Sequence, residues 1–348
     1  MGLAIVGTGR HLPKDVATNE DLSRMMDTTA EWIHQRTGIT ERHFAAEGEG
    51  VSDLGAAAAE RAIADAGLVA EDVDYVIMST MTPDFHFPGP AAMVAAKLGI
   101  PGVPCLDVRQ QCASFIYQLQ LANALLLSGE ASKIVLIGAE AHAGFMPWED
   151  WDYLYGRGGT PPSKEAFERA SRHRGLAILF GDGAGAVVIE KTEDARGVVG
   201  IDVHSDGRAA DYIHIPSGFT KRPYAQREDI DRDLHIPRMR GMLFKQAVTR
   251  LPESVRALCE RTGTALDDVD LFVAHQANDR INASVRDALG VPTAKVPSNI
   301  AKLGNTSAAT IPILLDELSE QGRFHAGMLV CFLALGAGLH WGSALLRT

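Results

Sequence analysis

Cys112 is the residue in this chain best placed to act as a nucleophile. An apolar run ends just before it, and the apolar residues Phe115, Leu119, Ala122 and Leu126 recur after it at the spacing of one helix face. The pattern predicts that Cys112 lies at or near a helix N-terminus, where unpaired N–H groups and the helix dipole favour the thiolate. A thiolate is the nucleophile that thioester chemistry needs. Position alone also allows a small buried side chain, which most free cysteines are.

Two further residues could complete a site with this thiol. The segment LFVA at 271–274 predicts a buried strand, and His275 follows it at the C-terminal end, where ligands bind in α/β sheets. Asn305 lies in LGNTSAAT, a small-residue helix start, and could also be an ordinary N-cap. Together with Cys112 these residues offer a thiol, an imidazole and an amide. An amide donates a hydrogen bond while remaining neutral.

The elements that must position these residues form two related halves. A helical pattern is followed by EDVDYVIMST at 71–80, and another by DDVDLFVAHQ at 267–276. Downstream in each half come a small-residue helix start, at Cys112 or Asn305, and then a Gly-Ala-Gly turn with an apolar strand. This self-similarity predicts duplicated α/β units packed face to face. We expect an N-terminal half at 1–190 and a C-terminal half at 191–348 that share one core.

Composition narrows the class of protein. Hydrophobic residues make up 46% of the chain, enough for a large core, and 33 basic against 44 acidic residues give a net charge of −11. An acidic chain disfavours a nucleic-acid partner, because phosphate binding needs a basic surface. The four dispersed cysteines indicate neither a disulfide framework nor a zinc site. The start of the chain has no targeting pattern and no run reaches membrane-spanning length, so we expect a cytoplasmic protein.

Several co-linear motifs resemble one family, β-ketoacyl-acyl-carrier-protein synthase III of the thiolase superfamily. The resemblance extends over nearly the whole chain. The motifs are DTTAEWIHQRTGITERH at 27–43, the Cys112 segment, FGDGAGAVV at 180–188, HQANDRI at 275–281, GNTSAAT at 304–310 and the terminal WGSALLR. The resemblance implies a thiolase-like duplicated αβαβα fold and an acyltransferase that condenses thioesters in fatty acid biosynthesis. It also implies a homodimer that needs no cofactor, with a coenzyme A thioester as substrate.

The family's mechanism can be carried over to particular residues. Cys112 would attack an acyl-CoA and form an acyl-enzyme, with the backbone N–H groups of Cys112 and Ala337 holding the oxyanion. Malonyl-acyl-carrier protein would then lose CO2. Hydrogen bonds from His275 and Asn305 would stabilise the resulting enolate, which would attack the acyl group on Cys112. No metal is required.

The resemblance also implies binding residues. Trp32 and Arg36 would stack on adenine or pair with phosphate at the coenzyme A entrance. The substrate-binding set is Thr28, Trp32, Arg36, Arg174, Asn278, Phe87 and Phe180. Phe87 would reach into the partner's acyl pocket, although simple packing is an equal alternative. Lys245 and Arg280 would form a basic patch for the carrier protein, or would be ordinary solvated charges.

The chain departs from the family pattern in places that bear on substrate choice. Ala337 stands where a glycine is frequent, and Asp279 weakens the basic patch. Residues 148–173 form an insertion rich in aromatic side chains, and long connections of this kind are often lids or binding loops. We expect the insertion either to shape the pocket for a medium or long acyl chain or only to pack on the surface.

Other activities remain open at this point. One alternative is a specialised enzyme of secondary metabolism that condenses other acyl thioesters or transfers acyl groups to a different nucleophile. A degradative thiolase is disfavoured, because the C-terminal turn LALGAGLHWG holds no second catalytic cysteine.

Overall fold

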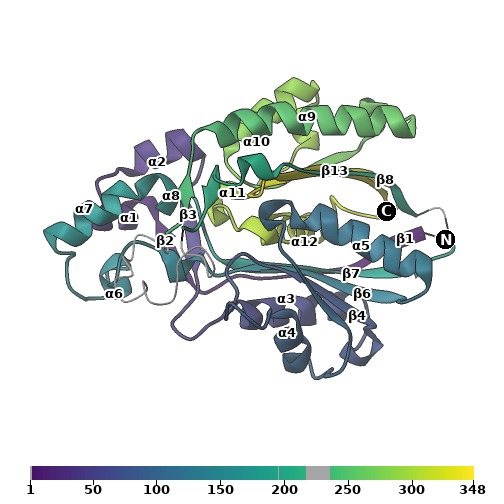
Figure 1. The fold of residues 1–348 in the computed structure, drawn as a ribbon, viewed down its shortest axis with the longest axis horizontal. Coiled ribbons are helices and arrows are strands. Elements are labelled where there is room, and N and C mark those ends of the chain that lie inside the picture. The colour runs from purple at the N-terminus through teal and green to yellow at the C-terminus, as the bar shows by residue number, and fades with distance from the viewer. Residues whose placement is uncertain (1, 195, 217–235) are drawn as a thin grey trace.

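The computed structural model describes residues 2–194, 196–216 and 236–348, and two β-sheets form its core (Figure 1). The first sheet has the strand order β1-β7-β6-β4-β5, and the second has the order β11-β12-β13-β8. The strands of the first sheet are β1 Gly2–His11, β4 Tyr75–Ser79, β5 Cys105–Val108, β6 Lys133–Glu140 and β7 Gly183–Thr192. Those of the second are β8 Gly197–Ser205, β11 Leu271–Ala274, β12 Leu329–Gly336 and β13 His340–Arg347.

The two sheets repeat one pairing pattern. In the first sheet β4 is parallel to β6, β6 is antiparallel to β7, and β7 is antiparallel to β1. In the second, β11 is parallel to β12, β12 is antiparallel to β13, and β13 is antiparallel to β8. The duplication that the sequence predicts is therefore confirmed. The chain leaves the first sheet after Thr192 and enters the second at Gly197, while the border at 190 stays a prediction.

Helices fill the space between the sheets and cover both outer faces (Figure 1). The inner pair is α5 Ser114–Ser128 and α12 Thr310–Glu320, and side chains of both join strands of both sheets in one apolar cluster. The outer helices are α3 Val51–Asp65 and α4 Ala91–Lys97 on the first sheet, and α9 Met242–Thr262 and α10 Asp279–Leu289 on the second. The predicted stripe of α5 is confirmed, because all its members are buried. The result is the expected αβαβα layering.

A smaller group of elements packs beyond one end of the sheets (Figure 1). It consists of β2 Asp15–Thr18, α1 Asn19–Met25, α2 Ala30–Thr37, β3 Glu41–Phe44, α6 Trp151–Leu154, α7 Lys164–Arg172 and α8 Arg174–Ala177. The insertion supplies α6 and α7. Ser163 is the N-cap of α7, as its sequence predicts.

The aromatic side chains of the insertion are packed inside this group. Trp148 is 6% exposed, and its ring lies 6.0 Å from Phe44 and 5.5 Å from Trp151. Trp151 in turn stacks with Tyr155 at 6.1 Å. Trp148 is therefore covered within the protein, whereas Trp151, Tyr153 and Tyr155 are half-buried, and Trp148, Trp151 and Tyr155 line a cavity.

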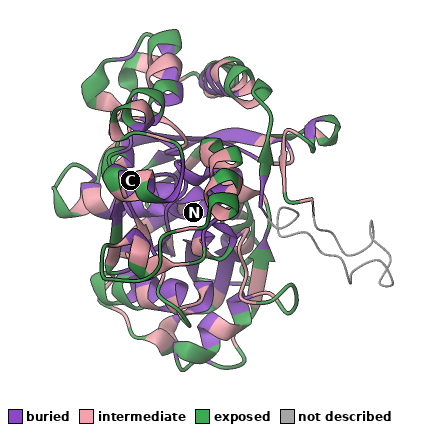
Figure 2. Ribbon diagram, turned by 90° about the vertical axis from the view of Figure 1, so that its left-hand side faces the viewer, coloured by how far each residue is buried: buried purple, intermediate pink, exposed green. Residues whose placement is uncertain are grey.

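The remaining short elements border the site described below. They are α11 Ile300–Leu303 and the pair β9 Ile213–His214 and β10 Arg238–Met239. Figure 2 shows buried residues gathered in the sheets and the helices between them, with exposed residues on the outer helices and loops. In the part of the chain that the structure describes, no helix is long and apolar enough to cross a membrane.

Candidate active site

Cys112 lies at the junction that the sequence predicts. A short 3₁₀ turn, Gln111–Ala113, leads directly into α5, and Gln111 has a left-handed φ of 52°. The Cys112 thiol donates to Ser307 Oγ at 3.4 Å. Burial raises the pKa of this thiol to about 12, which outweighs the lowering effect of the Ser307 hydrogen bond. The helix start is present, but desolvation of the thiol opposes the preference for the thiolate that the helix start predicts.

The turn after β12 presses against the backbone of Cys112. A Cβ atom built on Gly336 would lie 2.9 Å from Cys112 N and 2.8 Å from Ala113 N, so only glycine allows this approach. The next residue, Ala337, lines the same cavity as Cys112. The backbone of this turn is therefore packed closely against the start of the Cys112 helix.

His275 follows β11 and reaches the cavity from the second sheet. Its backbone N–H donates to Leu333 O at 2.9 Å, and its Nδ1 lies 2.7 Å from Thr310 Oγ1. Burial lowers the pKa of the imidazole to about 3. His275 is therefore neutral at physiological pH, and Nδ1 is occupied away from the cavity. The neighbouring Gln276 is fully buried and hydrogen bonds to Ala274 O, a structural role.

Asn305 comes from the segment before α12. It forms an isolated parallel bridge with Phe180, and its backbone N–H donates to Leu179 O at 2.8 Å. Its side-chain Oδ1 accepts the backbone N–H of Ser307 at 2.8 Å. This bond sets the orientation of the amide and leaves Nδ2 as the group that can donate into the cavity. Asn305 is not the N-cap of α12, which is Ala309.

Ser307 connects these groups, and sequence reasoning missed it. Its hydroxyl accepts from Cys112, its N–H donates to Asn305, and its carbonyl lies 3.0 Å from Thr310 Oγ1. It is fully buried and has a left-handed φ of 48°. Backbone strain of this kind persists only where surrounding contacts hold it. Both Ser307 and Thr310 belong to the GNTSAAT motif. The sequence therefore contained these residues but gave no indication of what they do.

Glu140 is the buried carboxylate that supports this strained segment. It is fully buried and accepts from Met81 N at 3.0 Å, Thr80 Oγ1 at 3.1 Å and Thr82 Oγ1 at 2.8 Å. It also lies 3.4 Å from the backbone N–H of Ala308, the residue after Ser307. Its negative charge contributes to the raised pKa of Cys112.

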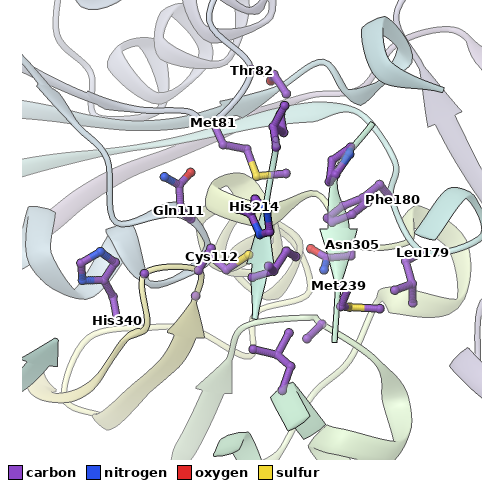
Figure 3. A pocket seen from close by; sticks show the side chains of 18 of the residues that line it. Met81, Thr82, Gln111, Cys112, Leu179, Phe180, His214, Met239, Asn305 and His340 are labelled. Carbon is purple, nitrogen blue, oxygen red and sulfur yellow. The ribbon is translucent and has the colours of Figure 1, made fainter. Parts of the chain in front are cut away.

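One cavity of about 1140 Å³ brings the predicted residues together (Figure 3). In the view of Figure 3, Cys112 and Asn305 lie between Gln111 and His340 on one side and Leu179 and Phe180 on the other. The predicted residues that line the cavity are Cys112, His275, Asn305, Ala337, Asn278, Phe87 and Phe180. Gln111 and His340 were not predicted.

A cation–aromatic group marks the predicted coenzyme A entrance. The guanidinium carbons of Arg36 and Arg174 lie 4.4 and 4.8 Å from the centre of the Trp32 indole. Arg174 also pairs with Asp27 at 3.4 Å. The hydroxyl oxygen of Thr28 is buried without a partner in the described part of the chain. These side chains offer a flat ring and two cations to a nucleotide, and none of them lines the Cys112 cavity.

Asn278 connects this entrance to the cavity. Its Nδ2 donates to Arg36 O at 3.0 Å, and its Oδ1 accepts the N–H of Arg280 as the N-cap of α10. Arg280 and Lys245 are both exposed, on α10 and α9 respectively. The Arg280 guanidinium lies 5.8 Å from the ring of Phe244.

Phe87 lies in an exposed loop at the rim of the cavity. It is 75% exposed, and Phe85 beside it is 57% exposed. One of the two edge strands of the first sheet, β5, precedes the Cys112 turn. The insertion contributes no lining residue to the Cys112 cavity. It lines a second cavity that shares Thr82 and Gly144 with the first.

Within residues 2–194, 196–216 and 236–348, no group of three or more His, Cys, Asp or Glu side chains could hold a metal ion. The expectation that no cofactor is needed stays a prediction.

Comparisons with known proteins identify the family that the chain resembles. Family models match at residues 33–144 (thiolase, N-terminal domain), 166–207 (3-oxoacyl-[acyl-carrier-protein] synthase III) and 259–348 (the C-terminal part of the same synthase). The β-ketoacyl-[acyl-carrier-protein] synthase III of Rhodobacter capsulatus is 40% identical over 98% of this chain and 97% of its own. That of Paracoccus denitrificans is 40% identical over the full length of both. The crystal structure of 3-oxoacyl-[acyl-carrier-protein] synthase III from Aquifex aeolicus superposes with a TM-score of 0.86 at 37% identity, with both chains fully covered.

Proposed function

The chain belongs to the β-ketoacyl-[acyl-carrier-protein] synthase III family, and on that basis we propose how its own residues perform the family's reaction. It is an acyl-transferring enzyme that condenses an acyl primer with malonyl-acyl-carrier protein in fatty acid synthesis. The observation that carries our assignment of residues is the meeting of Cys112, His275 and Asn305 in one cavity.

In the first half-reaction Cys112 takes the acyl group from coenzyme A. Its sulfur attacks the thioester carbonyl, and the N–H groups of Cys112 and Ala337 bind the oxyanion. The carbon–sulfur bond to coenzyme A then breaks, and the thiol proton of Cys112 ends on the departing sulfur. The raised pKa of Cys112 means that the thiol carries this proton at neutral pH before the attack.

In the second half-reaction malonyl-acyl-carrier protein replaces coenzyme A. Its carboxylate leaves as CO2, and the electron pair passes to the thioester oxygen as an enolate. Asn305 Nδ2 and the ring of His275 donate hydrogen bonds to that oxygen. The enolate carbon attacks the acyl group, and the released Cys112 sulfur takes up one proton from solvent. Loss of one such donor typically costs about 10²–10³ in rate.

The surfaces around the cavity can be assigned to the parts of the substrates that do not react, namely the coenzyme A nucleotide, its arm and the carrier protein. We propose that Trp32, Arg36 and Arg174 bind the nucleotide of coenzyme A and that Thr28 and Asn278 contact its arm. Lys245 and Arg280 would meet the acidic carrier protein, with ordinary solvated charge as the alternative. These assignments are supported by the cation–aromatic group and by the contact between Asn278 and Arg36.

We also propose a cytoplasmic homodimer that accepts medium or long primers. The exposure of Phe87 and the position of β5 at a sheet edge support the dimer. The size of the cavity supports a longer primer, because each buried methylene contributes roughly 0.8 kcal/mol. The insertion would act on chain length only through the second cavity, since it does not line the first.

The residue assignment is tested by observing which side chain becomes acylated. The protein is incubated with acetyl-CoA or octanoyl-CoA, and peptide masses locate the acyl group before and after malonyl-acyl-carrier protein is added. We expect the acyl mass on Cys112 and its loss on condensation. Cys112→Ala should carry no acyl group, whereas the control Cys259→Ala should behave as wild type. An acyl group on Cys105 or Cys259 would contradict the assignment.

Primer length is tested by the ratio of kcat/KM for octanoyl-CoA to that for acetyl-CoA. The ratio is measured for the native protein and for a variant in which a short Gly-Ser linker replaces residues 149–172. We expect octanoyl-CoA to be preferred and the preference to fall in the folded variant. A native enzyme that prefers acetyl-CoA overturns the proposed chain length, whatever the variant does.

A further inference from the structure

The His275 ring nitrogen that faces away from the cavity, Nδ1, contacts the hydroxyl group of one residue, Thr310. Thr310 Oγ1 lies 2.7 Å from His275 Nδ1, and both residues are buried, with exposures of 2% and 5%. Thr310 is the first residue of α12, and its hydroxyl also lies 3.0 Å from Ser307 O. A hydroxyl has one proton, so it can donate to only one of these two acceptors.

The two possible acceptors, Ser307 O and His275 Nδ1, differ in whether another hydrogen-bond donor reaches them. Ser307 O already accepts the backbone N–H of Thr310, which closes the 3₁₀ turn Ser307–Ala309. His275 Nδ1 has no other hydrogen-bond partner among the described residues, and its contact with the hydroxyl is the shorter one. Donation from Thr310 to Nδ1 therefore follows the shorter contact, and Ser307 O still accepts the backbone N–H of Thr310.

The direction of this bond decides what His275 presents to the cavity. The imidazole is neutral because burial lowers its pKa to about 3, so it carries one ring proton. If Nδ1 accepts from Thr310, that proton is on Nε2 and points toward the reacting oxygen. If Nδ1 instead donates to Thr310, Nε2 presents a lone pair that would repel an enolate.

We propose that Thr310 is a positioning residue that holds His275 in the tautomer protonated at Nε2. A neutral histidine then donates to the enolate oxygen without a change in its charge. The inference rests on the proposed function for the role of His275, but the tautomer can be measured without any substrate. An experiment can therefore contradict the tautomer without contradicting the proposed function, and the reverse.

The tautomer is measured directly by ¹⁵N NMR of the protein labelled at its histidines. Comparison with His275→Gln identifies the His275 signals among those of the 12 histidines. We expect an unprotonated Nδ1 and a protonated Nε2 in the wild type. A protonated Nδ1 overturns the proposal even if the enzyme is fully active. A wild-type protein that shows the expected tautomer but does not self-acylate would instead count against the proposed function.

Two substitutions separate the hydroxyl from the packing of the side chain. Thr310→Val keeps the shape and removes the hydroxyl, whereas Thr310→Ser keeps the hydroxyl. In Thr310→Val we expect the ratio of malonyl decarboxylation to Cys112 acylation to fall by up to about 10²–10³, the cost of one lost donor. Thr310→Ser should restore most of the ratio. Equal losses in both variants, or an unchanged ratio in a folded Thr310→Val, would overturn the proposal.

Discussion

Desolvation of the half-buried Cys112 thiol leads to a specific prediction about its reactivity in the absence of substrate. Its pKa of about 12 stands about three pH units above the ordinary cysteine value of 9.0. Each unit is a factor of ten in the thiolate population, so at neutral pH the thiolate is about a thousandfold rarer than in a free cysteine. Because only the thiolate is alkylated, iodoacetamide should react with Cys112 slowly.

The assay follows alkylation of the Cys112 peptide by mass spectrometry as pH is raised from about 7 to about 10. The rate should rise about tenfold per pH unit without levelling off, because the pKa lies above the range. A plateau with a midpoint near neutrality would refute the reasoning. It would mean that the dipole of α5 outweighs desolvation, as the sequence alone predicts.

Two substitutions should move this rate in opposite directions. The hydrogen bond to Ser307 lowers the pKa of Cys112, so Ser307→Ala should alkylate more slowly than wild type at each pH. The charge of Glu140 raises that pKa, so Glu140→Gln should alkylate faster. Changes of the same sign in both variants would indicate altered access to the thiol and not altered ionisation.

Further expectations concern the other residues of the site. His275→Ala and Asn305→Ala should still acylate Cys112 but lose malonyl decarboxylation by about 10²–10³, measured as CO2 release; failure to acylate with normal decarboxylation would reverse their roles. Gly336→Ala should lower both half-reactions, because its Cβ would overlap Cys112 N, whereas Gly175→Ala, with open space around it, should not. The pKa of His275 is lower in the folded than in the unfolded chain, so the unfolded chain binds more protons between about pH 3 and 6.5. The free energy of unfolding should therefore fall as pH decreases below 6.5, and His275→Gln should lessen that dependence in thermal unfolding scans.

Local patterns in the sequence were enough to predict the helix and strand that position Cys112 and His275. The stripe of α5, the strand before His275 and the N-cap at Ser163 depend on residues within a turn or two of one another. The duplication was also visible, because each half repeats the same order of patterns. Motif resemblance then indicated Cys112, His275 and Asn305 together, and the structure places all three in one cavity.

The tertiary structure alone decided how these groups act. Desolvation of Cys112 and His275 depends on what packs around them from distant segments, and it opposes the ionisation expected from the helix start alone. The contacts of Ser307 and Thr310 join residues far apart in the chain, so no local pattern could assign them a role. The aromatic residues of the insertion had the composition of a binding surface, but Phe44 packs against Trp148 and Trp151, and Trp148 is buried. A sequence shows which side chains are available, whereas burial and hydrogen-bond partners are set only when separate elements come together.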